Sequence, residues 1–314
     1  MEAICSGLCN SKSDVEDLLE LLFFENVFTL NKELEWLINQ KLISKGNFTL
    51  KLFSSIVVFI LFIILEEYEE SQKLRGTQLG RAILASSLSP DIALLIYDEL
   101  ERAIQSLALD NELHLLYLVT PLNNVPLWSN YINWHNFYNI WLKLPKQLLR
   151  VGRLIGISEK FFFERLQGLK VRSNRELQVH LRFLSSLALY ELINERTLCE
   201  VAERFSINRG ALQSLQQQSS TYACMIVAFC DRLGWNYLKI ILEGFAERLM
   251  FGIRKDLTDL VKISGIDGKR ARAFHNSHIT TIASLAVTPK IEIAKILRSA
   301  VPFIKYHRSF AYYY

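Results

Sequence analysis

Glycine and proline are scarce in this chain, with 13 and 6 copies among 314 residues. A fold of many short strands needs both residues in its turns, so their scarcity favours long helices with few connections. Apolar residues recur at steps of three and four over much of the chain, which is the spacing of one helix face. Half of all residues are hydrophobic, enough to form a sizeable core. The sequence therefore predicts a mainly α-helical, globular protein.

The net charge of +4 hides an uneven distribution. Residues 1–112 carry 9 Lys and Arg against 18 Asp and Glu, whereas residues 113–314 carry 27 against 14. The most basic stretch, residues 143–182, has 10 basic and 3 acidic side chains. A basic C-terminal two-thirds suits a polyanionic partner. A solvated surface of mixed charge accounts for the same distribution, so charge alone leaves both interpretations open.

The five cysteines form no C-x-x-C pair, and no histidines cluster with them. We therefore expect reduced thiols and neither a disulfide framework nor a metal site.

One apolar run, residues 52–65 (LFSSIVVFILFIIL), is followed closely by four glutamates. It has 14 residues, whereas a membrane-spanning helix needs about 20. We expect a buried segment or an insertion foreign to the fold (residues 48–71) rather than a membrane span. A membrane-anchored helical protein is the remaining alternative.

A long helix is predicted from Ala211 to Leu233. Its apolar positions recur at steps of three and four and define a core stripe: Leu212, Leu215, Ser219, Tyr222, Ile226, Phe229 and Leu233. Its opposite face carries small and polar side chains, among them Gln213 and Gln217, where exposed helices usually prefer Lys and Glu. That face fits either plain solvent exposure or a lining surface for another molecule.

A second pattern lies near residue 265. Residues 257–263 and 269–276 read as two short helices joined by the turn Ser264-Gly265-Ile266-Asp267-Gly268, the layout of a helix-hairpin-helix. The backbone N–H groups of such a turn can hold a phosphate, and Lys269, Arg270 and Arg272 add positive charge. A helical hairpin without a ligand explains the pattern as well.

Aromatic residues are dense between Trp128 and Trp141. A packed core is the usual explanation, and a platform on which bases stack is the alternative.

The sequence lacks several common catalytic and nucleotide-binding motifs. The sequence has no G-x-x-x-x-G-K-[ST] phosphate loop, no Asp-Glu pair after an apolar strand, and no G-x-S-x-G or H-E-x-x-H. We expect no ATPase activity from these residues.

Several segments together resemble the C-terminal half of the helicase region of DNA polymerase theta, a superfamily 2 repair helicase. The matching stretches are Thr77–Ala82, Ser86–Pro90, Leu113–Pro121, Asn208–Gln217 and Arg232–Trp235. The resemblance covers roughly residues 1–43 and 74–303. Archaeal repair helicases, more distant relatives, place an Arg and a Trp against DNA where this chain has Ser214 and Thr221.

The resemblance implies three domains: a partial winged helix (1–88), interrupted by the insertion 48–71, a helical ratchet domain (89–253) and a helix-hairpin-helix domain (254–304), followed by a tail (305–314). It implies a nuclear protein that binds single-stranded DNA. It also implies an ATPase motor region as a partner in a full-length relative, where alone ATP and Mg²⁺ would serve as cofactors.

The expected DNA contacts fall on the long helix and the hairpin, although Asp267 in the turn opposes a nearby phosphate. The residues are Arg209, Gln213, Gln217, Tyr222, Gly265, Gly268, Lys269, Arg270 and Arg272. A scaffold that binds proteins through the same helical domains is the alternative function.

Overall fold

The computed structural model describes residues 1–21, 30–45, 74–105, 111–122, 128, 132–171 and 173–300. Over these residues it is mainly α-helical, with one pair of three-residue strands, as the sequence predicts. The chain divides into two compact units, residues 1–93 with 227–239, and residues 94–226 with 240–314. The apolar run 52–65 lies outside the described residues, so the expectations for it are not tested.

The first unit contains short helices around a two-stranded antiparallel sheet, in which Lys45 pairs with Leu74. Thr77 joins the sheet to the next helix: its hydroxyl donates to the carbonyl of Lys41 (2.6 Å) and accepts from the N–H of Gly80, capping that helix. The elements of this unit are α1 (Glu2–Cys5), α2 (Lys12–Leu21), α3 (Leu30–Asn39), β1 (Ile43–Lys45), β2 (Leu74–Gly76) and α5 (Gln78–Ser86).

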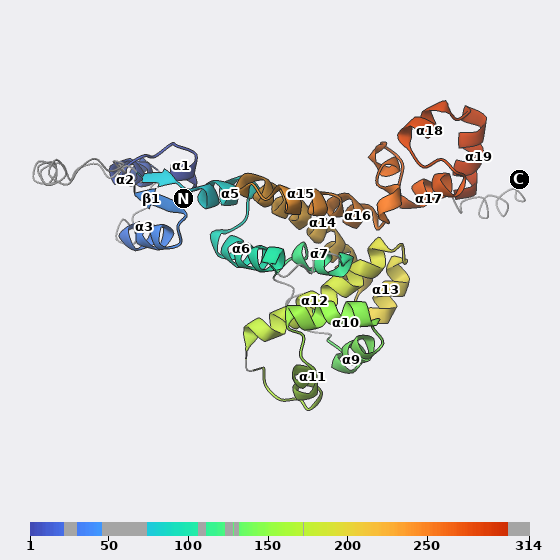
Figure 1. Ribbon diagram of the computed structural model, residues 1–314, viewed down its shortest axis with the longest axis horizontal. Coiled ribbons are helices and arrows are strands. Elements are labelled where there is room, and N and C mark those ends of the chain that lie inside the picture. The colour runs from blue at the N-terminus through green and yellow to red at the C-terminus, as the bar shows by residue number, and fades with distance from the viewer. Residues whose placement is uncertain are drawn as a thin grey trace, which may run out of the picture. The chain divides into compact units, whose positions relative to one another are not determined.

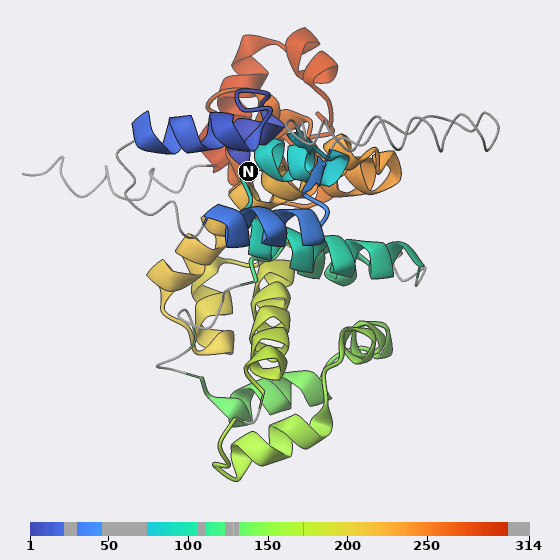
Figure 2. The ribbon, with the colours of Figure 1, turned by 90° about the vertical axis from the view of Figure 1, so that its left-hand side faces the viewer.

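The second unit is built around α12 (Asn174–Ile193), which is buried from His180 to Leu189. Helix α12 packs against α7 and α16, and α13 (yellow) lies beside its C-terminal half in both Figure 1 and Figure 2. The helices before and after α12 are α6 (Pro90–Gln105), α7 (Glu112–Leu118), α9 (Trp134–Leu142), α10 (Lys146–Ile155), α11 (Glu159–Leu166), α13 (Leu198–Phe205), α14 (Arg209–Leu233), α15 (Asn236–Glu243) and α16 (Phe245–Phe251).

The dense aromatics form a core, as the usual explanation predicts. Trp128, Phe137 and Trp141 are each at most 2% exposed. Trp141 meets Phe183 of α12 edge to face at 5.9 Å, and the indole N–H of Trp128 donates to Ser185 (2.8 Å). Because these three rings are buried against other side chains, they are not available to stack on bases.

Helix α14 begins at Arg209 and ends at Leu233. The predicted core stripe is confirmed from Leu212 to Phe229, where all six of its members are buried. Gln213 and Gln217 are exposed. The period of three and four therefore identified both faces correctly.

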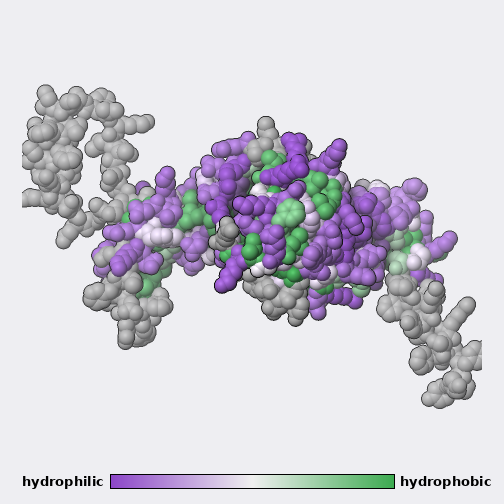
Figure 3. All heavy atoms as spheres, turned by 90° about the horizontal axis from the view of Figure 1, so that it is seen from below, coloured by the Kyte–Doolittle hydropathy of each residue, from purple (hydrophilic) through white to green (hydrophobic). Residues whose placement is uncertain are grey.

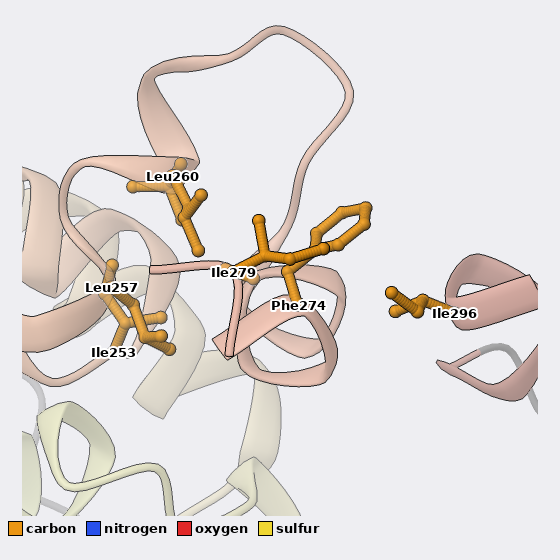
Figure 4. Packing of buried hydrophobic residues seen from close by; sticks show 8 residues of the cluster. Ile253, Leu257, Leu260, Phe274, Ile279 and Ile296 are labelled. Atoms are coloured by element: carbon orange, nitrogen blue, oxygen red, sulfur yellow. The ribbon is translucent and has the colours of Figure 1, made fainter. Parts of the chain in front are cut away.

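The last part of the chain has its own apolar cluster, which comprises Ile253, Leu257, Leu260, Val261, Ala271, Phe274, Ile279 and Ile296 (Figure 4). It is assembled from two 3₁₀ turns, η2 (Lys255–Leu257) and η3 (Leu260–Lys262), and from α17 (Gly268–Asn276), α18 (Ile282–Val287) and α19 (Lys290–Ala300).

The expected helix over residues 257–263 is corrected to these two 3₁₀ turns. Leu257 ends η2 and Leu260 begins η3, and the two residues between them keep right-handed helical φ and ψ, so both leucines point to one side and are buried in the same core.

No single helix among the described residues is long and apolar enough to cross a membrane. Helices α5 and α6 together have the length and composition of a span, but they meet at a bend of 111°. Figure 3 shows hydrophilic residues over most of one face, with hydrophobic residues in scattered groups. All five cysteines (Cys5, Cys9, Cys199, Cys224 and Cys230) are free thiols.

Candidate nucleic-acid interface

A cleft of about 860 Å³ opens in the second unit, between the connection from α12 to α13, the start of α14 and the hairpin before α17. It brings together side chains from parts of the chain that are more than 70 residues apart in sequence. Its lining residues are Leu192, Glu195, Arg196, Thr197, Leu198, Cys199, Arg209, Gln216, Phe251, Gly252, Asp267, Gly268, Lys269, Arg272 and Ala300.

Helix starts determine where these side chains lie. Thr197 and Glu200 form a capping box at the start of α13, and the side chain of Asn208 accepts from the N–H groups of Gly210 and Ala211 at the start of α14. Asp267 caps α17 by accepting from the N–H of Arg270 (2.9 Å). Each of these helices therefore begins at or beside the cleft.

Two glycines permit the close approach of backbone at the cleft wall. A Cβ on Gly268 would lie 2.8 Å from Cγ2 of Ile253, so any larger residue would push α17 away from the core. Gly252 has φ +62°, a left-handed conformation that ends α16, and its place beside Gln216 leaves little room.

Arg272 is held by two carboxylates. Its guanidinium bonds to Glu195 through both Nε (2.8 Å) and Nη2, and to Asp256 through Nη1 (2.9 Å). The hydrogen bonds that Arg272 donates to Glu195 raise the pKa of Arg272, so the guanidinium stays charged. This network joins the end of α12 to the hairpin and fixes the geometry of the cleft. Its charge is already largely neutralised, which limits what Arg272 can offer to another anion.

Arg209 and Lys269 are different, because neither forms an ion pair with any residue that the structure describes. Both are exposed and both line the cleft. They lie on different elements, the first turns of α14 and α17, and face one space. Two uncompensated cations at one concave site make it attractive to an anion.

Two of the hairpin's own side chains bond to its backbone. Asp267 occupies the start of α17 with its own carboxylate, and the Arg270 guanidinium donates back to the carbonyl of Gly265. Gly265 has φ +86° and lies in open surroundings. Of the predicted hairpin contacts, Gly268, Lys269 and Arg272 line the cleft, whereas Gly265 and Arg270 do not.

On α14 the predicted residues separate into two groups. Arg209, Gln213 and Gln217 succeed one another at steps of four, so they follow one side of the helix, and all three are exposed. Tyr222 is only 8% exposed, its hydroxyl is buried with no hydrogen-bond partner among the described residues, and burial raises its pKa to about 12. We therefore correct the expectation that the side chain of Tyr222 contacts a DNA strand, because its position on the apolar stripe directs it into the core.

Sequence reasoning missed Arg196 and Gln216 as lining residues. Gln216 lies between the two faces of α14 and donates to the carbonyl of Leu249 (2.7 Å), which no local pattern indicates. Arg196 follows a helix end, and only the fold brings it to the cleft. Among the described residues no group of three or more His, Cys, Asp or Glu side chains could hold a metal ion.

The fold and the cleft define a mainly helical module with cations from separate helices around one concave site. Residues 90–249, just over half of the chain, match the family described as "DNA_pol_Q helicase like region helical domain". The chain belongs to this family, and the expected resemblance to the helicase region of DNA polymerase theta is confirmed.

Individual relatives agree. The chain is 44% identical over 305 residues to "DNA polymerase theta" of Caenorhabditis elegans, covering 96% of this chain and 17% of the relative. It is 35% identical to "DNA polymerase theta" of Drosophila melanogaster over 96% of this chain and 15% of the relative. "Helicase POLQ-like" of Homo sapiens is 24% identical over 73% of this chain. The chain thus spans about one-sixth of the two most similar of these relatives.

Proposed function

We propose that this chain is a single-stranded DNA-binding accessory region of a polymerase theta-type DNA-repair helicase. The observation that carries the proposal is the cleft that Arg209 and Lys269 both line, where neither side chain forms an ion pair with a described residue. Cations on fixed helices contact phosphates independently of base sequence, which is the mode of nonspecific strand binding. The similarity to proteins named DNA polymerase theta and Helicase POLQ-like supports the same assignment.

A single strand fits this site better than a duplex. Proteins read duplex DNA by inserting a helix or a β-ribbon into a groove, which requires a protruding element. Here the uncompensated cations line a concave space instead, and Gln213 continues the exposed side of α14 beyond Arg209. Glutamine side chains can bond to phosphate, sugar or base edges without selecting a sequence.

The domain assignment belongs to the same proposal. Helices α2 and α3 with the β1–β2 pair support a partial winged helix over residues 1–88. The 25-residue α14 supports a ratchet domain over residues 89–253. The hairpin before α17, with its own apolar cluster, supports a helix-hairpin-helix domain over residues 254–304. In this proposal the protein works in the nucleus, in DNA repair, and the ATPase motor that binds ATP and Mg²⁺ is supplied by another region of a full-length protein.

The test measures binding of a fluorescent single-stranded oligonucleotide by anisotropy between about 50 and 200 mM salt. Affinity of the unmodified chain should fall steeply with salt. Arg209→Ala with Lys269→Ala should weaken binding and reduce the slope of log affinity against log salt by about 1.4, or about 0.7 for each phosphate that is no longer neutralised. Lys290→Ala with Lys295→Ala removes the same charge from exposed positions of α19 outside the cleft and is the matched control.

A flat salt response, or equal losses of affinity in the two double variants, would overturn the proposal. Salt-insensitive capture of a protein instead would favour the scaffold alternative. The exposed side chains of Val287 (85%) and Ile291 (87%) on the C-terminal module are the feature that favours that alternative.

A further inference from the structure

A second cavity, of about 340 Å³, lies close to the cleft, where the connection from α9 to α10 meets the end of α12 and α13. Its walls carry four cations and one carboxylate, Glu191, among apolar side chains. The lining residues are Ile140, Lys143, Leu144, Pro145, Leu148, Leu187, Tyr190, Glu191, Asn194, Arg196, Arg204, Phe205 and Arg254.

The carboxylate is already engaged. Glu191 is 15% exposed at its side chain, and it forms ion pairs with Arg204, whose Nη1 lies 2.6 Å from its carboxylate, and with Arg196, whose Nε lies 3.4 Å from it. The other two cations, Lys143 and Arg254, form no side-chain ion pair within the described part of the chain. The cavity therefore has more positive charge than its own acid can balance.

Arg196 joins the two cavities, because it lines both. Its side chain is 55% exposed, and 3.4 Å is a loose separation for an ion pair at a surface, where such pairs contribute little. The guanidinium can therefore contact an anion in either space.

Helix α10 continues the positive charge beyond the second cavity. Lys146, Arg150 and Arg153 follow one another on α10 at steps of four and three, so they lie along one side of the helix. Lys143 precedes α10, at the end of α9, and all four side chains are exposed. Helix α10 contains no acidic residue, and none of these four cations forms an ion pair within the described residues.

The opposite side of α10 is fixed by packing. A Cβ on Gly152 would lie 2.4 Å from Cζ3 of Trp141, so the helix rests directly on a buried indole, with Val151 only 3% exposed beside it. This packing holds the basic side outward. From Lys146 to Arg153, seven residues at about 1.5 Å each span about 10 Å along the helix axis.

We propose that single-stranded nucleic acid bound in the cleft continues past Arg196, through the second cavity at Lys143 and Arg254, and along the basic side of α10. This basic track, defined as Arg196, Arg254, Lys143, Lys146, Arg150 and Arg153, rests on the proposed function of the cleft and extends it. The continuity follows from two residues: Arg196 lines both cavities, and Lys143 lines the second cavity three residues before Lys146, where α10 begins. A strand longer than the cleft reaches the further cations of the track, and each phosphate that they neutralise releases counter-ions.

The experiment compares oligothymidylates of about 6 and about 20 nucleotides, one near the lower end of the footprints of common single-strand-binding folds, which are about 4 to 16 nucleotides, and one beyond their upper end. The full chain carrying Arg150→Ala with Arg153→Ala is measured beside the unmodified chain and the Lys290→Ala, Lys295→Ala control. We expect the unmodified chain to bind the longer strand more tightly. The α10 variant should lose affinity for the longer strand only, with its salt slope lowered by about 1.4, and should bind the shorter strand as before. The cleft variant at Arg209 and Lys269 should weaken both lengths.

The outcomes separate the track from the cleft. Failure of the unmodified chain to bind either length would reject the cleft, and the track with it. Binding of the short strand with an unchanged salt slope for the long strand in the α10 variant would overturn the track alone, as would an equal loss of affinity in the control. Competition by a polyglutamate peptide as effective as an oligothymidylate of equal charge would instead assign the track to an acidic protein. Helical circular dichroism of each variant shows that α10 remains folded.

Discussion

At the scale of single residues, two buried arginines connect the helices of the second unit. Arg182 is 1% exposed, donates to the carbonyl of Thr120 (2.8 Å), pairs with Glu99, and lies 4.3 Å from the ring centroid of Tyr117. Arg248 is 4% exposed and pairs in a fork with Glu112 at 2.8 and 3.2 Å. Each guanidinium is satisfied only while its carboxylate is present.

Their acidic partners differ in exposure, which predicts different costs of removal. The Glu99 side chain is 23% exposed and that of Glu112 is 44% exposed. Glu99→Gln should lower the free energy of unfolding by about 2 kcal/mol, because it leaves a buried cation without its counter-charge. Glu112→Gln should cost about 1 kcal/mol, since water can reach its site. Urea unfolding of both variants measures the difference, and equal costs would show that burial of the partner does not control the effect.

His180 predicts a dependence of stability on pH. It is fully buried on α12; its Nδ1 faces the carbonyl of Glu176 at 2.8 Å and its Nε2 accepts from the N–H of Ser158 at 3.2 Å. These partners fit the neutral ring protonated at Nδ1, and burial lowers its pKa. A second proton on Nε2 would face another N–H donor.

Because the unfolded chain binds the proton more readily, the stability contributed by His180 is present above about pH 6.5 and is lost as pH falls below that value. Unfolding free energies measured from pH 7.5 to about 5.5 should therefore decrease, and His180→Gln should reduce the decrease. Substitution of the exposed His278 is the control, and an equal effect there would contradict the assignment to His180.

At the scale of elements, periodicity predicted which face of a helix is buried, but it did not predict which residues from distant helices lie together. The core stripe of α14 follows from the spacing of its apolar residues, so the sequence predicted it. The capping of α17 by Asp267 was not predicted, since only the charge of Asp267 was considered from the sequence. Tyr222 lies on the predicted core stripe and was also expected to contact a DNA strand. Its side chain is buried, which is incompatible with the second expectation. That Arg196 and Lys269 line the same cleft was not predictable, because it depends on packing between helices distant in sequence.

The contributions of the exposed side of α14 and of the hairpin to strand binding can be compared with two double variants that change the net charge equally. Gln213→Glu with Gln217→Glu and Lys269→Ala with Arg270→Ala each make the net charge more negative by two, so general attraction of DNA changes equally. We expect the glutamine pair to weaken strand binding more. Its new carboxylates would follow Arg209 along one side of α14, whereas Arg270 already bonds to Gly265, so the hairpin variant removes only Lys269 from the cleft.

Anisotropy at one salt concentration decides between the two elements. A larger loss of affinity in the hairpin variant would place the main contact at the start of α17 rather than along α14. Unchanged helical content in both variants is required for the comparison.

At the scale of the whole molecule, the two proposed binding sites follow the charge division of the sequence. The cleft and the basic track both lie in the second unit, within the part of the chain that carries 27 Lys and Arg against 14 Asp and Glu. The first unit lies mainly in the acidic residues 1–112. Strand binding should therefore depend on the second unit, and changes in the first should reach it only through stability.

The last prediction concerns residues 48–71, the expected insertion. Lys45 ends β1 and pairs with Leu74, which begins β2, so the strands are neighbours at the point where that segment leaves and returns. Deleting residues 48–71 leaves residues 46, 47, 72 and 73 as a loop of about four residues, a length that antiparallel hairpins commonly use. We expect the deletion variant to keep the helical circular dichroism and the cooperative thermal unfolding of the full chain, with improved solubility because an apolar run is removed. It should also bind a single strand with the affinity and salt slope of the full chain, since the cleft and the track are unaltered. Deletion of α6 (Pro90–Gln105) is the control for loss of a packed element, because α6 supplies the buried Ala93, Ile96 and Leu100. Loss of cooperative unfolding in the 48–71 deletion, as in that control, would show that the segment belongs to a core and is not an insertion.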